Sequence, residues 1–137
     1  MNPFKKDRVL EQARLLIGTT YDQLDCSHFV HKAFAQAGMV YTYRNSASFA
    51  SDPDDRFESV GFNLDAGLLE PGDVIVFNGH MGIWDPDGCI ILGGNEQCKN
   101  LKNKAPFLSS RSGGNRGPDY GQLKWWSGDY QVFRWSD

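Results

Sequence analysis

The sequence predicts an α+β fold in which N-terminal helices pack on a small antiparallel β-sheet. Over the first forty residues, apolar side chains recur at helical spacing, whereas the later apolar runs are short and rich in β-branched residues. Gly, Asn, Asp and Pro residues, which favour turns, separate those later runs. A group of helices followed by a group of strands is typical of α+β proteins.

Length and charge bound the size of the protein and the class of its partners. The 137 residues suffice for one hydrophobic core, so we expect residues 1–137 to form a single domain, and we expect a monomer. The net charge of −3 is uneven, because residues 97–134 carry seven basic and only two acidic side chains. No zinc-finger or helix-turn-helix pattern accompanies these basic residues, which argues against nucleic acid as a partner. No apolar run approaches the ~18 residues that span a bilayer, so we expect no membrane contact.

Two helices are predicted at the start of the chain. The first covers residues 7–17, whose Val, Leu, Ala and Ile side chains form one apolar face. The second begins at Cys26, with Asp25 as its N-cap and Gly38 just after its C-terminal end. Cys26 would then lie in the first helical turn, where free N–H groups and the helix dipole favour a thiolate. Cys26 is therefore a candidate nucleophile, and a small buried hydrophobic residue is the alternative interpretation.

The centre of the chain combines a long polar stretch with several predicted strands. Residues 41–67 are polar and predicted to be irregular, and they are too long for a simple connection, so they form a candidate binding loop. Residues 74–77 are a continuous β-branched run, typical of a strand that is covered on both faces. Residues 80–84 and 89–93 are predicted to be the strands of a hairpin, joined across the turn signal at 85–88.

The last third of the chain is predicted to contain one strand. Residues 98–128 are rich in Gly, Ser, Asn and Lys, and we expect them to form a long surface excursion. Residues 130–135 are predicted to be the strand that closes the sheet.

The predicted hairpin would bring together the side chains that a cysteine nucleophile needs. In either even register, His80 and Asn95 lie on the same face of the sheet and within reach of each other. Catalysis by a thiol requires an imidazole to take its proton and a third group to orient that imidazole. Cys26 supplies the thiol, His80 the imidazole and Asn95 the orienting group. Gln97 is the next candidate for the orienting group, because it would point to the same side of the strand as Asn95. For His80 alone, the competing interpretation is a histidine at a strand start that bonds a backbone carbonyl.

Other histidines and cysteines are weaker candidates for this chemistry. His28 and His31 lie about 200° and 140° around the helix axis from Cys26, so we expect both to point away from it. Cys26, Cys89 and Cys98 form no C-x-x-C pair, and no spaced histidines accompany them, so we expect neither a metal nor another cofactor. Because three cysteines cannot all pair with one another, at least one thiol is free, and we expect it to be Cys26.

Four motifs follow one another within roughly residues 20–97: Asp25-Cys26-Ser27 opening a helix, Pro71-Gly72-Asp73 leading into a strand, Gly79-His80-Met81-Gly82-Ile83-Trp84, and Leu92-Gly93-Gly94-Asn95-Glu96. In this order they resemble the NlpC family of cell-wall cysteine peptidases. Tyr21 resembles the family tyrosine that hydrogen-bonds near the thiol. The resemblance implies a compact papain-like α+β fold, with the cysteine on a helix packed against an antiparallel sheet that carries the histidine.

The resemblance also implies roles for individual residues. Cys26 would be the nucleophile, His80 the general base and Asn95 the residue that orients it. The backbone N–H of Cys26 would contribute to an oxyanion hole. Residues near the nucleophile are expected to contact the substrate: Tyr21, Asp25 and Ser27.

The implied reaction is hydrolysis of an amide bond in the peptide stems of bacterial peptidoglycan. We find no cleavable signal segment, so we expect synthesis in the cytoplasm and action in the periplasm of a target bacterium. In this the chain resembles the small antibacterial amidase effectors of type VI secretion, which are bacteriolytic toxins neutralised by a cognate immunity protein. The alternatives are a phage-encoded lytic or tail hydrolase, a non-catalytic peptidoglycan-binding module, and a thiol acyltransferase or deamidase on the same fold.

Overall fold

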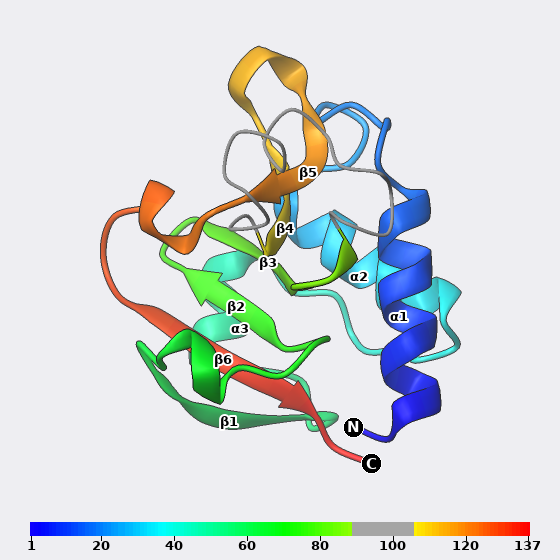
Figure 1. Ribbon diagram of the computed structural model, residues 1–137, viewed down its shortest axis with the longest axis vertical. Coiled ribbons are helices and arrows are strands. Elements are labelled where there is room, and N and C mark those ends of the chain that lie inside the picture. Colours follow the sequence, from blue (N-terminus) through cyan, green and yellow to red (C-terminus); the bar gives the residue numbers. More distant parts are fainter. Residues whose placement is uncertain (89–105) are drawn as a thin grey trace.

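The computed structural model describes residues 1–88 and 106–137, and within them three α-helices accompany one antiparallel sheet (Figure 1). The helices are α1 (Pro3–Leu15), α2 (Cys26–Gln36) and α3 (Ser46–Ser51). The strands are β1 (Phe57–Phe62), β2 (Val74–Phe77), β3 (His80–Trp84), β4 (Phe107–Arg111), β5 (Gly117–Gly121) and β6 (Tyr130–Trp135). Three short 3₁₀ turns complete the described elements: η1 (Ala66–Leu68), η2 (Gly113–Asn115) and η3 (Leu123–Trp125). The strand order in the sheet is β1-β6-β2-β3-β4-β5.

The first helix begins earlier than the sequence pattern predicts. Asn2 is its N-cap and accepts a hydrogen bond from the backbone N–H of Lys5, while Pro3 occupies the first helical position. Pro suits that position because its fixed φ matches the helix and its missing N–H is not needed there. The prediction over 7–17 placed the start four residues too late, since it followed the apolar face and not the Asn-Pro signal.

The second helix forms as predicted. The Asp25 side chain accepts a hydrogen bond from the backbone N–H of His28, so Cys26 is the first helical residue. Gly38 follows the helix with a φ of +80°, a left-handed conformation in which Gly pays no steric penalty. Both ends of the helix are therefore fixed by local chemistry, and they set the position of Cys26.

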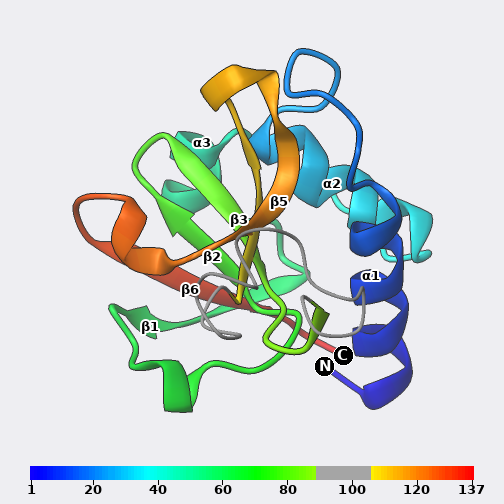
Figure 2. The ribbon, with the colours of Figure 1, turned by 45° about the horizontal axis from the view of Figure 1, so that its top comes forward.

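The core has two parts, one on each face of the sheet. The apolar side of α2 packs on one face, where α2 contacts β3, β4 and β5, and α1 packs on α2 (Figures 1 and 2). Five fully buried aliphatic side chains of β2, β3 and β4 meet the helices there: Val74, Val76, Met81, Ile83 and Leu108. The opposite face carries a second buried cluster: Leu69, Ile75, Phe77, Trp84, Phe107 and Val132. The strand over 74–77 is thus covered on both faces, as expected.

Two predictions about irregular segments are wrong. Residues 41–67 contain α3 and β1, and the buried rings of Phe49 and Phe57 tie both elements to the core. The described part of 98–128 contains β4 and β5, which pair along their whole length and are almost entirely buried. Their Ser, Gly and Pro residues have low β-propensity, so propensity alone does not predict β4 and β5 as strands. Packing against neighbouring strands decides their structure. The predicted strand over 89–93 lies outside the described residues.

Candidate active site

The thiol of Cys26 lies at the N-terminal end of α2 and is nearly enclosed. Cys26 is 7% exposed, and the backbone N–H of Met81 on β3 donates a hydrogen bond to its sulfur. Burial raises the pKa of this thiol above its ordinary value, although the N–H groups of Met81, Ser27 and Cys26 itself act in the opposite direction. The expectation that the helix start favours a thiolate is therefore wrong for the folded protein, because desolvation outweighs the local N–H groups.

The imidazole of His80 stands at the first position of β3, next to Met81. Its ring stacks on Trp126 at 4.4 Å between centroids, and its Nε2 atom lies 2.9 Å from the Oγ atom of Ser109 on β4. Burial, together with the positive charge of Arg111, lowers the pKa of His80 to about 4. At neutral pH the ring is therefore uncharged and can accept a proton.

The fold carries the imidazole one position along β3 from the residue that contacts the thiol. The N–H of Met81 bonds the Cys26 sulfur, and His80 directly precedes Met81 in β3. Within residues 1–88 and 106–137, the only hydrogen bond of the His80 ring is the one from Nε2 to Ser109. The Nδ1 atom is therefore the ring nitrogen that can serve the thiol.

A polar cleft of about 390 Å³ opens in front of His80. It is bounded by the turn between β2 and β3, the end of β4 and the segment that follows β5. Its lining residues are Tyr21, Asn78, Gly79, His80, Arg111, Ser112, Gly113, Trp125 and Trp126. Burial raises the pKa of the Tyr21 phenol, and the nearby Cys26 and Asp25 act in the same direction. Two sequence candidates, Tyr21 and His80, therefore line the same cleft, and Cys26 lies near Tyr21.

The remaining sequence candidates occupy other positions. Asp25 caps α2 and holds the His28 ring, whose Nδ1 atom lies 2.8 Å from its carboxylate. Ser27 is buried, with its Oγ atom 2.7 Å from the hydroxyl of Tyr43. Both side chains are thus engaged in fixing the start of α2, and neither lines the cleft in front of His80. Asn95, predicted to orient the base, and Gln97 lie outside the described residues.

The two other histidines lie away from the thiol, as predicted. His28 stacks on Tyr43 at 4.2 Å between ring centroids, and its side chain is more than half exposed. The Nε2 atom of His31 lies 2.9 Å from the carbonyl oxygen of Tyr41.

Sequence reasoning missed three residues of the site, Ser109, Arg111 and Trp126. All three fall in the segment that the composition assigned to a surface excursion. Ser109 and Arg111 are two positions apart in β4, so both side chains share the sheet face that carries His80. Polar residues at every second position are the sequence signal of such a strand, but here the pattern covers too few residues to be distinguished from chance.

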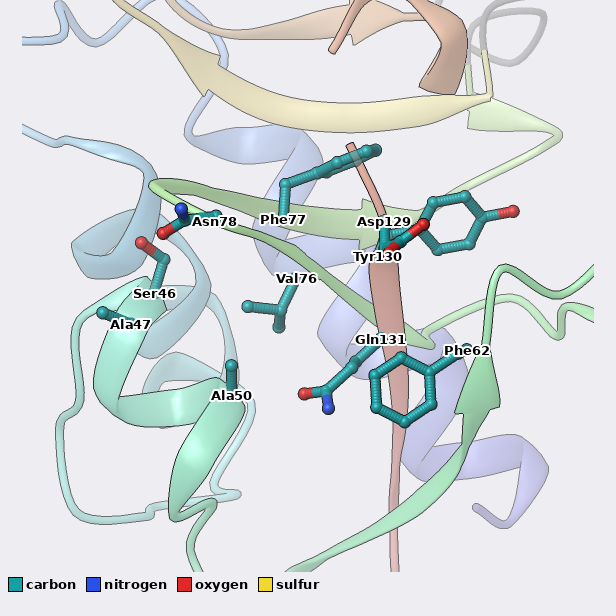
Figure 3. Close-up of a pocket in the computed structure, with 10 residues that line it drawn as sticks. All are labelled: Ser46, Ala47, Ala50, Phe62, Val76, Phe77, Asn78, Asp129, Tyr130 and Gln131. Carbon is teal, nitrogen blue, oxygen red and sulfur yellow. The ribbon is translucent and has the colours of Figure 1, made fainter. Parts of the chain in front are cut away.

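A second pocket, of about 290 Å³, lies between α3 and the strands β1, β2 and β6 (Figure 3). Its floor is apolar, formed by Ala50 and Val76, and the Gln131 side chain points toward Ala50 (Figure 3). Asn78 lines both this pocket and the cleft beside His80. His80 lines the cleft and not this pocket, and Cys26 lines neither, so we place the candidate chemistry at His80 in the cleft.

The described residues contain neither a cluster of metal-binding side chains nor a membrane-spanning helix. Among them, no three His, Cys, Asp or Glu side chains are grouped so that they could hold a metal ion. None of the described helices is long and apolar enough to cross a membrane.

A thiol at a helix start, beside an imidazole on an antiparallel sheet, is the arrangement of papain-like cysteine hydrolases. The comparison with family models agrees: residues 15–111 match the model of the NlpC/P60 family, and the chain belongs to this family. The family supports the papain-like α+β fold and suggests activity as a cysteine peptidase or amidase on peptidoglycan. A search of curated proteins returned no match to the chain.

Proposed function

We propose that the protein hydrolyses an amide bond in the peptide stems of peptidoglycan, with Cys26 as nucleophile and His80 as general base. The observation that carries the proposal is the contact between the Cys26 sulfur and the N–H of Met81, the residue next to His80. Membership of the NlpC/P60 family supports the same substrate class.

The state of the two groups at rest suggests how the reaction starts. Burial keeps Cys26 as a thiol and His80 as a neutral imidazole, so the proton moves only when a substrate carbonyl is in place. The Nε2 atom of His80 lies 2.9 Å from the Ser109 hydroxyl. In this proposal Nε2–H donates to that hydroxyl, which leaves the lone pair of Nδ1 to take the thiol proton. In this proposal Ser109 fills the orienting role, and Asn95 is the alternative predicted from the sequence.

The proposed reaction has two halves. In the first, the sulfur bonds to the carbonyl carbon as Nδ1 takes its proton, and the backbone N–H of Cys26 stabilises the negative oxygen. The C–N bond then breaks, and the imidazolium returns the proton to the leaving amine. In the second half, His80 deprotonates a water molecule that attacks the thioester, which releases the carboxylic acid and restores the thiol.

Digestion of purified sacculi tests this function. The wild-type protein should release soluble fragments with new amino termini, and Cys26→Ala and His80→Ala should release none. Cys89→Ala and Cys98→Ala are the matched controls and should retain activity. Retention on sacculi without cleavage would instead identify a non-catalytic binding module. Full digestion by Cys26→Ala would exclude the thiol mechanism.

We further propose that the protein is an antibacterial effector of the type VI kind, acting in the periplasm of a target cell and paired with an immunity protein. Membership of the NlpC/P60 family supports the peptidoglycan target that such an effector would need. Expression in the bacterial cytoplasm should be tolerated, whereas fusion to a periplasmic signal should lyse the host. Lysis should disappear with Cys26→Ala.

The same experiment separates the competing roles. Toxicity that is equal in both compartments and depends on Cys26 would indicate a cytoplasmic target, hence a deamidase or an acyltransferase. A phage enzyme would be indicated by two results together. The gene would lie beside holin or tail genes, and no product of a neighbouring gene would relieve the lysis caused from the periplasm.

A further inference from the structure

Arg111 occupies an unusual position in the cleft. It ends β4 and lines the cleft together with His80, although its side chain is only 22% exposed. The guanidinium carbon lies over the Trp125 ring, 4.9 Å from its centroid, which is a cation–π contact. This contact uses none of the N–H donors of the guanidinium, so they are left for other partners.

The hydrogen-bonding capacity of Arg111 is not used by the part of the chain that the structure describes. No hydrogen bond to the Arg111 side chain is formed there, and its Nη1 atom is buried without a partner. The nearest carboxylate oxygen, Oδ2 of Asp119, is 4.0 Å away and lies 3.0 Å from Nη1 of Arg116. Buried guanidinium nitrogens are normally hydrogen-bonded, so an Nη1 atom without a hydrogen-bond partner beside a cleft indicates a missing acceptor.

The local charge balance indicates an anionic acceptor. Of the charged groups described in this corner, two guanidinium groups, those of Arg111 and Arg116, face the single carboxylate of Asp119. Burial and the charge of Arg116 lower the pKa of Arg111, and the charge of Asp119 acts in the opposite direction. A carboxylate in the cleft would supply both the missing charge and a bidentate acceptor.

We propose that Arg111 is a specificity-determining residue that binds a free carboxylate of the substrate next to the amide bond that is cleaved. This proposal rests on the proposed function and narrows its substrate class to acidic peptides. Arg111 and His80 line the same cleft, so a bound carboxylate would lie beside the base. The cleft volume of about 390 Å³ accommodates a carboxylate together with the chain that bears it. A peptide whose carboxylate has been amidated would leave the guanidinium unpaired and would bind less well.

Two matched synthetic stem peptides test the proposal, one with free carboxylates and one in which a single carboxylate near the scissile bond is a carboxamide. One such pair is made for each carboxylate near the scissile bond. For at least one pair, the wild-type protein should hydrolyse the acid peptide with a kcat/KM at least about 10-fold higher than that for the amide peptide. Arg111→Gln should reduce kcat/KM for the acid by about 10- to 100-fold and leave the amide within about 3-fold, which removes the preference.

Two controls keep the result specific. Arg111→Lys keeps the charge but not the paired donors, and should recover part of the preference. Lys124→Gln removes a positive charge from an exposed position of η3, and should keep the full preference. Thermal unfolding of each variant checks that the sheet is intact. A wild-type protein that cleaves every acid and amide pair equally well would overturn the proposal and leave the proposed function standing.

A binding measurement separates failure of this proposal from failure of the proposed function. Affinities of the same peptides are measured by calorimetry for Cys26→Ala and for Cys26→Ala combined with Arg111→Gln. Cys26→Ala should bind the acid peptide about 10-fold more tightly than the amide peptide, and the double variant should lose this difference. That result supports the role of Arg111 even if no peptide is hydrolysed. Equal affinity for acid and amide in Cys26→Ala would overturn the role of Arg111 whether or not the wild-type protein is active.

Discussion

The Nε2 atom of His80 lies 2.9 Å from the Oγ atom of Ser109, across 29 positions of the sequence. The two residues belong to the neighbouring strands β3 and β4 but are not directly opposite, because the pairing of Ile83 with Leu108, continued by one residue, places Ser109 beside Gly82. A side chain at position 82 would fill the space between them. The hydroxyl thus reaches the imidazole diagonally, and stacking on Trp126 supports the ring from the side.

Loss of the Ser109 hydroxyl should reduce turnover without abolishing it. Ser109→Ala removes the group that fixes the His80 tautomer, and we expect kcat to fall by about 10-fold or more, but less than in His80→Ala. Steady-state hydrolysis of a soluble stem peptide measures both variants. Asn95→Ala is the matched test of the orienting residue predicted from the sequence. A large loss in Asn95→Ala with none in Ser109→Ala would transfer the orienting role to Asn95.

The low pKa of His80 should make the protein less stable in acid. In the unfolded chain the imidazole has its ordinary pKa near 6.5, whereas burial lowers it to about 4 in the folded protein. Between these values the unfolded state binds a proton that the folded state does not. The free energy of unfolding should therefore fall as the pH drops from about 6.5 to 4, by up to about 1.4 kcal/mol per pH unit. Urea unfolding of wild type and His80→Gln at several pH values isolates this contribution, and parallel pH curves would contradict it.

Gly82 should tolerate no side chain, because β4 approaches it closely. A Cβ atom at this position would lie 2.6 Å from both the carbonyl oxygen of Leu108 and the Cβ of Ser109. Gly82→Ala should cost about 1–3 kcal/mol and reduce activity by displacing Ser109 from His80. Gly67 is the matched control, since a Cβ there meets no described atom within 4 Å, and Gly67→Ala should be neutral within about 0.5 kcal/mol. Equal thermal stability of the two variants would contradict the packing argument.

Two carboxylates that share Arg134 should differ strongly in their effect on stability. Asp73 is enclosed and bonds the guanidinium of Arg134 at two points, 2.8 and 2.9 Å. Asp73→Ala leaves that guanidinium half-buried without its main partner and should cost about 3–5 kcal/mol. Glu70 also contacts Arg134, at 3.2 Å, but its side chain is 60% exposed, so Glu70→Ala should cost about 0–1 kcal/mol. Urea unfolding compares the two, and similar losses would contradict the assignment.

Local signals in the sequence predicted the elements whose chemistry lies within a few residues. The N-cap Asp25 and the following Gly38 fixed the span of α2 and the position of Cys26 within it, and the structure agrees. The strands over 74–77, 80–84 and 130–135 were also predicted, because continuous β-branched or aromatic runs between turn residues indicate strands. Family resemblance added the papain-like form of the fold and the peptidoglycan substrate, which no single stretch of the sequence could supply.

Long-range packing decided the rest. β4 and β5 are strands because each pairs with a neighbour, and their own composition favours loops. That pairing brings Ser109 and Arg111 beside His80, a contact between positions about thirty residues apart that periodicity does not report. Burial likewise reversed the expected pKa shift of Cys26, because the enclosure of a thiol depends on every element around it. The sequence alone determined which residue opens α2, and only the tertiary structure determined the environment in which its sulfur must react.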